Sequence, residues 1–314
     1  MNLSESALIF PGQGSQSQAM LEDYFNNEEI FSNTFDEARE VLDVDFKSLI
    51  FSDNKEELSK TEITQPLMLI ANIALWRTLK LDPSSFGAMA GHSLGEFAAL
   101  VAGEVIQFPD ALNIVSLRAK LMQDAVPQGK GGIAAIIGLN LNVIESICSD
   151  ITNFKHELVS PANINSPIQI VISGTHKGVK LAIERCKKEG AKRALPLAMS
   201  VPAHCKLMTQ AATEFASRLE NIKFQKPAVK IFQNYDASYT TNIEIIMTNL
   251  VHQLVSPVKW VKIVENINSL NINIFIECGP GKVLSGLVKR IVNNVEIISL
   301  DDYSSFTENF KNKK

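Results

Sequence analysis

The chain has 314 residues, of which 46% are hydrophobic and 20% are charged, as is typical of a protein that folds in water. Its formal net charge of −4 argues against a nucleic-acid-binding surface. The four cysteines form no Cys-x-x-Cys motif, and a chain of this size needs no disulfide scaffold, so we expect reduced thiols. No apolar run approaches the ~18 residues of a membrane-spanning helix, and the N-terminus lacks a signal-peptide pattern. We therefore expect a cytoplasmic protein without a membrane partner.

The first predicted strand covers residues 7–10, an apolar run that ends at a loop with the sequence Pro-Gly-Gln-Gly-Ser-Gln. Loops at the carboxyl ends of strands often hold ligands in α/β proteins. This loop lacks the Gly-Lys-Ser/Thr ending of a phosphate-binding loop, which argues against a nucleotide site. On its own the pattern favours an ordinary turn over a ligand-binding loop. Residues 18–60 are predicted to form helices and connecting loops.

A strong helix is predicted at residues 67–79, with Thr64 as its N-cap and Pro66 in its first turn, where a missing amide costs nothing. The helix is apolar nearly all round, so we expect it to be buried. Residues 82–85 break the helix, and a short apolar strand follows that ends at Gly91. This alternation of strands and helices predicts a parallel sheet of the α/β type.

The sequence Gly-His-Ser-Leu-Gly at residues 91–95 lies between that strand and a run with helical character. A Gly-x-Ser-x-Gly turn in this context is typical of a nucleophile elbow, which exposes a serine hydroxyl on a strained backbone. Gly91 and Gly95 are expected there because the strand and helix backbones approach too closely for side chains. Amides at the start of the helix would face negative charge that develops at Ser93. The alternative is a glycine-rich turn that enters a core helix, and the pattern alone weighs the two equally.

The next helix is predicted at residues 111–125, capped by Asp110. Arg118 lies among its apolar residues. A buried arginine costs free energy unless it meets an anion, which makes Arg118 a candidate anion ligand. The helix pattern alone favours a surface arginine whose stem lies along the helix.

A smaller unit is predicted at residues 128–198, after a flexible Pro-Gln-Gly-Lys-Gly-Gly segment. Its predicted strands are residues 133–138, 158–163, 168–173 and 194–198, and its predicted helices are 142–150 and 176–189. The resulting order, β-α-β-β-α-β, is that of the ferredoxin-like motif. We therefore predict a small ferredoxin-like subdomain inserted into a large α/β subdomain made of residues 1–127 and 199–314.

The chain returns to the large subdomain at Ser200 and continues the α/β pattern. Further helices are predicted at residues 207–219 and 244–254, around Trp260 and up to residue 292, and further strands at 229–232, 273–277 and near 297. The sequence contains no internal repeat.

A serine nucleophile needs a base within hydrogen-bond reach and an oxyanion hole. The five histidines are His92, His156, His176, His204 and His252. His204 lies in the loop where the chain re-enters the large subdomain and is the best candidate base by position, with a surface histidine as an equal alternative. No convincing acid stands at a strand end between Ser93 and His204, which counts against a hydrolase triad. A backbone or amide oxygen would have to orient His204 instead.

Seven segments, in order along nearly the whole chain, resemble the malonyl-CoA:acyl carrier protein transacylases of bacterial fatty-acid synthesis. The segments are Phe-Pro-Gly-Gln-Gly-Ser-Gln at 10–16, Gly-His-Ser-Leu-Gly-Glu at 91–96, Arg118 with Met-Gln at 122–123, Asn-Ile-Asn-Ser-Pro at 163–167, Ser-Val-Pro-Ala-His-Cys at 200–205, Gln-Leu-Val-Ser-Pro-Val-Lys-Trp at 253–260 and Gly-Pro-Gly-Lys-Val-Leu at 279–284. The resemblance implies an α/β-hydrolase-like large subdomain with a parallel sheet, plus an inserted ferredoxin-like small subdomain. This agrees with the fold expected from the patterns.

The resemblance also implies catalytic roles. Ser93 would be the acylated nucleophile and His204 its general base. The main-chain carbonyl of Gln253 would orient His204, which answers the missing acid. The backbone amides of Gln13 and Leu94 would form the oxyanion hole, where the loss of one donor costs on the order of 10²–10³ in rate.

Substrate-binding roles follow from the same resemblance. Arg118 would hold the free carboxylate of the malonyl group by a bidentate pair. Asn163 and His92 would support the pocket. Because an acetyl group would leave Arg118 unpaired, a dicarboxylic acyl group is favoured. Malonyl and methylmalonyl differ by one methyl group, worth only ~1–3 kcal/mol, and the sequence leaves that choice open.

The implied partners are malonyl-CoA and holo acyl carrier protein, in a ping-pong reaction without a metal or redox cofactor. We expect no nucleic-acid partner and a monomer. Two basic clusters could dock the acidic carrier, and solvated helix charge is an equal alternative for each. The first comprises Lys187, Lys188, Lys192 and Arg193, and the second Lys282, Lys289 and Arg290.

Two rival functions share some of these residues. A serine hydrolase, such as a thioesterase or lipase, would use Ser93 and His204, would not need Arg118 and would show net hydrolysis. A non-catalytic carrier-binding module would fail to acylate Ser93. The presence of all three residues argues against the second rival.

Overall fold

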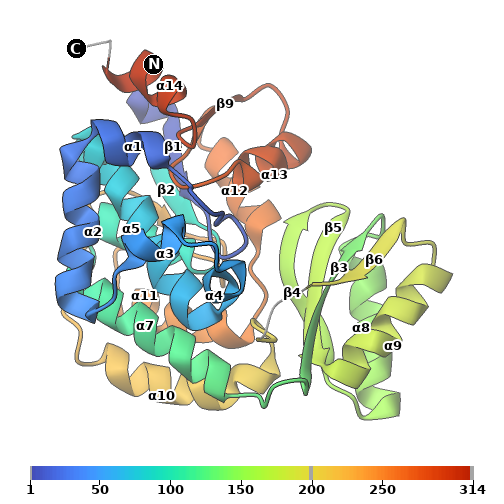
Figure 1. The fold of residues 1–314 in the computed structure, drawn as a ribbon. Coiled ribbons are helices and arrows are strands. Elements are labelled where there is room, and N and C mark those ends of the chain that lie inside the picture. Colours follow the sequence, from blue (N-terminus) through green and yellow to red (C-terminus); the bar gives the residue numbers. More distant parts are fainter. Residues whose placement is uncertain (1, 198–200, 312–314) are drawn as a thin grey trace.

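The computed structural model describes residues 2–197 and 201–311, which form two subdomains side by side (Figure 1). The large subdomain is built on a five-stranded parallel sheet with the strand order β7-β2-β1-β8-β9. Its strands are β1 (Ser6–Phe10), β2 (Ala88–Gly91), β7 (Ile231–Phe232), β8 (Ile274–Glu277) and β9 (Glu296–Ser299). The carboxyl ends of β1 and β2 are neighbours, with Phe10 opposite Gly91, so the two loops that follow these strands meet at one edge.

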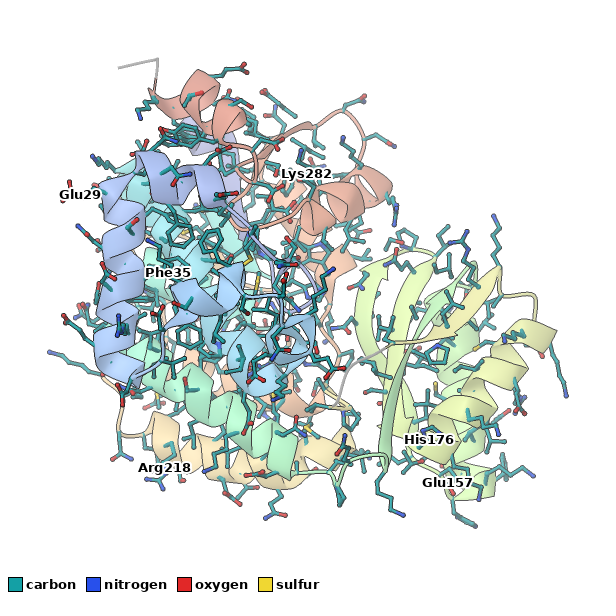
Figure 2. All side chains as sticks on the ribbon, viewed as in Figure 1. Glu29, Phe35, Glu157, His176, Arg218 and Lys282 are labelled. Carbon is teal, nitrogen blue, oxygen red and sulfur yellow. The ribbon has the colours of Figure 1, made fainter. Side chains whose placement is uncertain are left out.

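Helices cover both faces of this sheet, as a parallel sheet requires. Alternate residues of β1 point to opposite faces: Leu8 and Phe10 join the core under α5, α6 and α7, whereas Ala7 and Ile9 join the core under α12 and α13. The helices are α1 (Glu22–Asn27), α2 (Glu29–Leu42), α3 (Phe46–Phe51), α4 (Lys55–Ser59), α5 (Thr61–Leu79), α6 (Gly95–Ala102), α7 (Phe108–Asp124), α10 (Thr209–Leu219), α11 (Ile243–Val255), α12 (Trp260–Asn268), α13 (Val283–Ile291) and α14 (Tyr303–Phe306). Phe35 points from α2 into the interior (Figure 2).

The small subdomain is a four-stranded antiparallel sheet with the order β4-β5-β3-β6 and two helices on one face. Its elements are β3 (Gly131–Ile137), α8 (Leu141–Lys155), β4 (Val159–Ser166), β5 (Gln169–Thr175), α9 (His176–Lys188) and β6 (Arg193–Pro196). The element order and strand order are those of the ferredoxin-like motif. The predicted fold class, an α/β protein with a parallel sheet and a ferredoxin-like insertion, is confirmed.

The predicted start of α5 is wrong. The helix begins at Thr61 after an N-cap at Lys60, so Thr64 and Pro66 lie inside it. Thr64 does not cap an amide, since its hydroxyl donates to the carbonyls of Leu58 and Lys60. Pro66 removes only the bond to the carbonyl of Glu62, which is an exposed residue in the first turn.

The predicted start of α7 is also wrong, because the helix begins at Phe108 with Gln107 as the N-cap. Pro109 stands in the first turn, where its missing amide costs nothing, and Asp110 follows it. The division into residues 1–127, 128–198 and 199–314 stays a prediction. Three of these predictions lie outside the described residues. They are the second boundary, the end of the strand predicted at 194–198, and the return of the chain at Ser200.

None of the helices described between residues 2 and 311 combines the length and apolarity needed to cross a bilayer.

Candidate active site

Ser93 stands on a strained turn between β2 and α6. Its φ is +52°, a left-handed conformation that side chains rarely adopt. A Cβ atom at Gly91 would lie 1.9 Å from the carbonyl oxygen of Gly95, and one at Gly95 would lie 2.1 Å from the carbonyl oxygen of Phe10. These distances confirm that the strand and helix approach too closely for side chains, as a nucleophile elbow requires.

His204 contacts the serine directly. Its Nε2 atom lies 2.7 Å from Ser93 Oγ, and its Nδ1 atom lies 2.7 Å from the main-chain carbonyl oxygen of Gln253. A carbonyl only accepts, so Nδ1 carries the proton and Nε2 is free to accept the serine proton. Burial, followed by the charge of Arg118, lowers the pKa of His204 to about 3. The ring is therefore an unprotonated base at neutral pH, and a backbone oxygen fills the place of the triad acid.

The other histidines lie away from the Ser93 hydroxyl. His92 faces the small subdomain, with Nε2 2.8 Å from Asn165 Oδ1 and its ring edge-on to Trp260. His176 begins α9 at the lower end of the small subdomain in Figure 2, where its backbone amide donates to the Lys130 carbonyl. His252 stacks on Tyr235. Within the described residues, His204 is thus the one histidine that contacts Ser93.

The loop after β1 packs against the Ser93 turn. A Cβ atom at Gly12 would lie 2.4 Å from the carbonyl oxygen of His92, so only glycine allows this approach. Gln13, from this loop, and Leu94, before α6, both line the cavity beside Ser93. Among the described residues neither amide meets an acceptor. Two amides without acceptors beside Ser93 are compatible with an oxyanion hole, and that role for Gln13 and Leu94 stays a prediction.

Arg118 lies beside the serine and is buried, so the surface arginine that the helix pattern favours is wrong. Its Nη1 donates to Gln65 Oε1, and its Nη2 lies 2.9 Å from Gln253 Oε1 and 3.5 Å from Ser93 Oγ. Its Nε has no partner in the described part of the chain. Burial lowers the pKa of Arg118 to about 10, so the guanidinium remains charged at neutral pH. A buried cation with a free donor is suited to a small anion.

A cavity of about 330 Å³ joins these groups. It is lined from the large subdomain by Ser93, His204 and Arg118, and from the small subdomain by Ile133, Asn163, Asn165, Val171 and Leu197. Asn163 and His92 therefore lie where the sequence expectation places them, at the wall of the pocket. Of the eight predicted site residues, Gln253 alone does not line the cavity and stands behind Arg118 and His204 instead.

Three residues that hold the site together were not predicted from the sequence. Gln65 Oε1 accepts from Arg118, and Asn165 Oδ1 accepts from His92 Nε2. Asn234 accepts from the Ser93 amide at 2.6 Å and donates to the Gly91 carbonyl at 2.6 Å. A polar side chain next to the long apolar run of α5 was the available signal for Gln65. Asn234 lies in a loop, where a polar residue is ordinary and gives no indication of a functional role.

An α/β fold with a Ser–His pair on a strained elbow and a buried arginine beside it is an arrangement suited to acyl transfer. Residues 7–303 match the family described as "Acyl transferase domain". The chain belongs to this acyl transferase family, and it is an acyltransferase.

Relatives of known name agree. The chain is 45% identical over 309 residues to the malonyl CoA-acyl carrier protein transacylase of Haemophilus influenzae, covering 97% of each chain. It is 39% identical over 311 residues to the enzyme of that name from Staphylococcus aureus, covering 98% of this chain and all of the relative. The family resemblance drawn from the sequence is confirmed.

Solved structures give the same result. An acyl carrier protein S-malonyltransferase from Vibrio cholerae superposes with a TM-score of 0.92 at 43% identity, covering 97% of this chain and 99% of that one. A malonyl-transacylase in complex with a type II PKS acyl-carrier protein superposes with a TM-score of 0.94 at 44% identity, covering 98% and 99%.

Proposed function

We propose that the protein transfers the malonyl group of malonyl-CoA to the phosphopantetheine thiol of an acyl carrier protein, through an ester on Ser93. The observation that carries this proposal is the place of Arg118. Its guanidinium is buried 3.5 Å from Ser93 Oγ, so it can pair with a carboxylate on the same acyl group that the serine attacks. The names of the relatives support malonyl-CoA and the carrier as the two substrates.

In the first half-reaction, His204 Nε2 takes the proton of Ser93 as Oγ attacks the thioester carbonyl. The amides of Gln13 and Leu94 donate to the oxyanion of the tetrahedral intermediate. The carbon–sulfur bond then breaks, and the proton on His204 passes to the CoA thiolate. CoA leaves, and the malonyl group remains as an ester of Ser93.

The second half-reaction reverses these steps with a new thiol. His204 takes the proton of the carrier's phosphopantetheine thiol, and the sulfur attacks the ester carbonyl. The same two amides hold the oxyanion. The carbon–oxygen bond to Ser93 breaks, and His204 returns the proton to Oγ. Only acyl groups and protons move, so we propose that the reaction uses no metal or redox cofactor.

Arg118 selects the acyl group. A malonyl carboxylate satisfies the buried guanidinium, whereas an acetyl group leaves it facing an apolar methyl without a partner. Selectivity therefore comes mainly from the cost of an unpaired charge.

We propose that the carrier docks at the second basic cluster, which lies on α13 and at its N-cap. Three residues of this helix line the cavity, namely Val283, Leu284 and Leu287, so a carrier held there would have a short path to Ser93. Arg290 Nη1 also donates to Gln169 Oε1 at 2.7 Å, which ties this helix to the small sheet. The first cluster lies on α9 and β6, and residues of α9 do not line the cavity.

Charge reversal separates the two clusters. With Lys289→Glu, we expect the KM for the carrier to rise at low salt while acylation by malonyl-CoA is unchanged. The matched control is Lys187→Glu with Lys188→Glu. It should change neither the KM for the carrier nor the rate of acylation by malonyl-CoA. The opposite pattern would move the docking site to α9.

The transfer itself is tested by mixing the protein, malonyl-CoA and holo carrier, and by following the mass of the carrier and the release of free malonate. We expect the carrier to gain a malonyl group that is lost with Ser93→Ala. Release of free malonate without charged carrier would support a hydrolase instead.

We further propose that the protein works as a monomer in the cytoplasm, without a nucleic-acid or membrane partner.

A further inference from the structure

Glu96 is a buried carboxylate in the first turn of α6, three residues after Ser93. Its Oε2 atom accepts two hydrogen bonds, from the backbone amide of Asn234 at 3.0 Å and from Nε2 of Gln253 at 2.7 Å. Its Oε1 atom lies 3.5 Å from Nε2 of Gln233. The proposed reaction gives this carboxylate no chemical step, yet both partners of Oε2 contact the active site.

The bond to Gln253 sets the direction of that side-chain amide. Oε2 of Glu96 accepts, so the NH₂ group of Gln253 must face it, and the same NH₂ group donates to the Ser93 carbonyl at 3.0 Å. The amide oxygen of Gln253 is thereby turned to Arg118, where it accepts from Nη2 at 2.9 Å. If the amide were reversed, its NH₂ group would face the N–H groups of Arg118.

The bond to Asn234 supports the serine turn. Glu96 holds the backbone of Asn234, whose side chain accepts from the Ser93 amide and donates to the Gly91 carbonyl. Oε2 of Glu96 is therefore linked to the Ser93 turn through Asn234. It is linked to Arg118 through the side chain of Gln253.

Burial raises the pKa of Glu96 to about 7, while the hydrogen bonds from Asn234 and Gln253 and the charge of Arg118 lower it. Either protonation state leaves Oε2 able to accept. Asn234 and Gln253 need only an oxygen that accepts their hydrogen bonds, and an amide oxygen at the same place would also accept them.

We propose that Glu96 is a positioning residue, whose Oε2 atom orients Arg118 through the Gln253 amide and the Ser93 turn through Asn234. The inference rests on the proposed function, because its predicted effect on the malonyl preference requires that Arg118 binds the acyl carboxylate. It predicts two separable effects. Loss of the acceptor slows acylation by every acyl group through Asn234, and it lowers the preference for malonyl through Gln253.

The test compares Glu96→Met, which removes the acceptor, with Glu96→Gln, which keeps one. Rates of Ser93 acylation are measured with malonyl-CoA and with acetyl-CoA, and folding is checked by thermal unfolding. In Glu96→Met we expect both rates to fall and the malonyl-to-acetyl ratio to fall by about tenfold, the worth of one hydrogen bond to a charged group. In Glu96→Gln we expect the ratio to stay within about threefold of wild type, as rescue by the conservative change.

A second variant keeps the test valid if Glu96→Met does not fold. Gln253→Met removes the side-chain link and keeps the main-chain carbonyl that orients His204. We expect it to lower the ratio as far as Glu96→Met does, and we expect the double variant to lower it no further, because both changes break one link. The control is Glu277→Met, at another buried carboxylate, whose oxygens accept from the amides of Leu284 and Ser285. It should leave the ratio unchanged.

The outcomes distinguish a failure of the proposed function from a failure of the positioning role of Glu96. A wild-type protein that forms no malonyl ester overturns the proposed function and this inference with it. A wild type that takes up malonyl, with a ratio that stays constant in Gln253→Met or in folded Glu96→Met, overturns the positioning role alone. Additive effects in the double variant, or a ratio lost equally in Glu96→Gln, would also overturn it.

Discussion

Nδ1 of His204 is hydrogen-bonded to the main-chain carbonyl of Gln253, at 2.7 Å, and the side chain of the same glutamine is hydrogen-bonded to Arg118. One residue of α11 therefore contacts both the base and the arginine. Because the contact to His204 uses the backbone, the glutamine side chain can be changed without removing the partner of the imidazole. This separation makes the contributions of base and arginine accessible to individual measurements.

The depressed pKa of His204 predicts an unusual pH profile. An ordinary histidine titrates near pH 6.5, and it loses its function as a base below that pH. Burial lowers the pKa of His204 to about 3, so the neutral form persists as the pH falls. We expect kcat/KM for acylation by malonyl-CoA to stay level between about pH 7 and pH 5. A tenfold loss per pH unit that begins near pH 6.5 would show that the base titrates normally.

The close approach at Gly95 predicts a severe effect of one methyl group. The Cβ atom of Gly95→Ala would lie 2.1 Å from the Phe10 carbonyl oxygen, and the contacted atoms belong to the backbone, not to a flexible side chain. We expect a loss of roughly 3 kcal/mol or more in the free energy of unfolding, with loss of acylation. The control is Gly286→Ala in α13, where nothing lies within 4 Å, and it should stabilise the protein by about 0.5–1 kcal/mol. Equal effects of the two changes would contradict the described elbow.

Gln65 is expected to contribute to acyl selectivity. Gln65→Leu removes the acceptor of Arg118 Nη1 and should lower acylation by malonyl-CoA by about tenfold, with a smaller effect on acetyl-CoA. Thr78→Val is a matched change in the same helix, because it removes a buried hydroxyl that donates only within α5, to the Ala74 carbonyl. Its rates should equal those of wild type. If Gln65→Leu lowered both acyl rates equally, Gln65 would have no specific link to the arginine.

Asn234 is expected to act on the nucleophile, irrespective of the acyl group. Asn234→Ala removes the acceptor of the Ser93 amide and the donor to the Gly91 carbonyl, so malonyl and acetyl acylation should fall together, by about tenfold or more. Asn266→Ala removes a comparable side-chain bond, to the Ala237 carbonyl, away from the serine, and should be neutral for activity. A change in the malonyl-to-acetyl ratio with Asn234→Ala would show that this residue acts on Arg118 as well.

The sequence was sufficient to predict the parts of the fold that depend on local pattern. The buried run of β1, the glycines around Ser93 and the strand–helix order of the small subdomain each follow from hydrophobic periodicity and turn residues. The starts of α5 and α7 were predicted wrongly, because both helices begin before the residues that look like caps. Thr64 satisfies carbonyls instead of amides, which a pattern of residue types does not distinguish.

The candidate site needed three-dimensional contacts. The pattern around Arg118 favours a surface arginine, and only the packing of α5, α7 and α11 buries it. Asn234 stands 141 residues from Ser93, a separation that no local rule bridges. The family resemblance supplied the expectation for Gln253, and it gave no indication that the Gln253 side chain joins Glu96 to Arg118.

The most direct test of the account is the intact mass of the protein after mixing with malonyl-CoA or acetyl-CoA, for wild type, Ser93→Ala and Arg118→Ala. We predict a malonyl adduct on wild type and little acetyl, no adduct on Ser93→Ala, and a preference reversed toward acetyl on Arg118→Ala. Equal uptake of both acyl groups by wild type, or release of malonate without an adduct, would contradict malonyl transfer through Ser93 guided by Arg118.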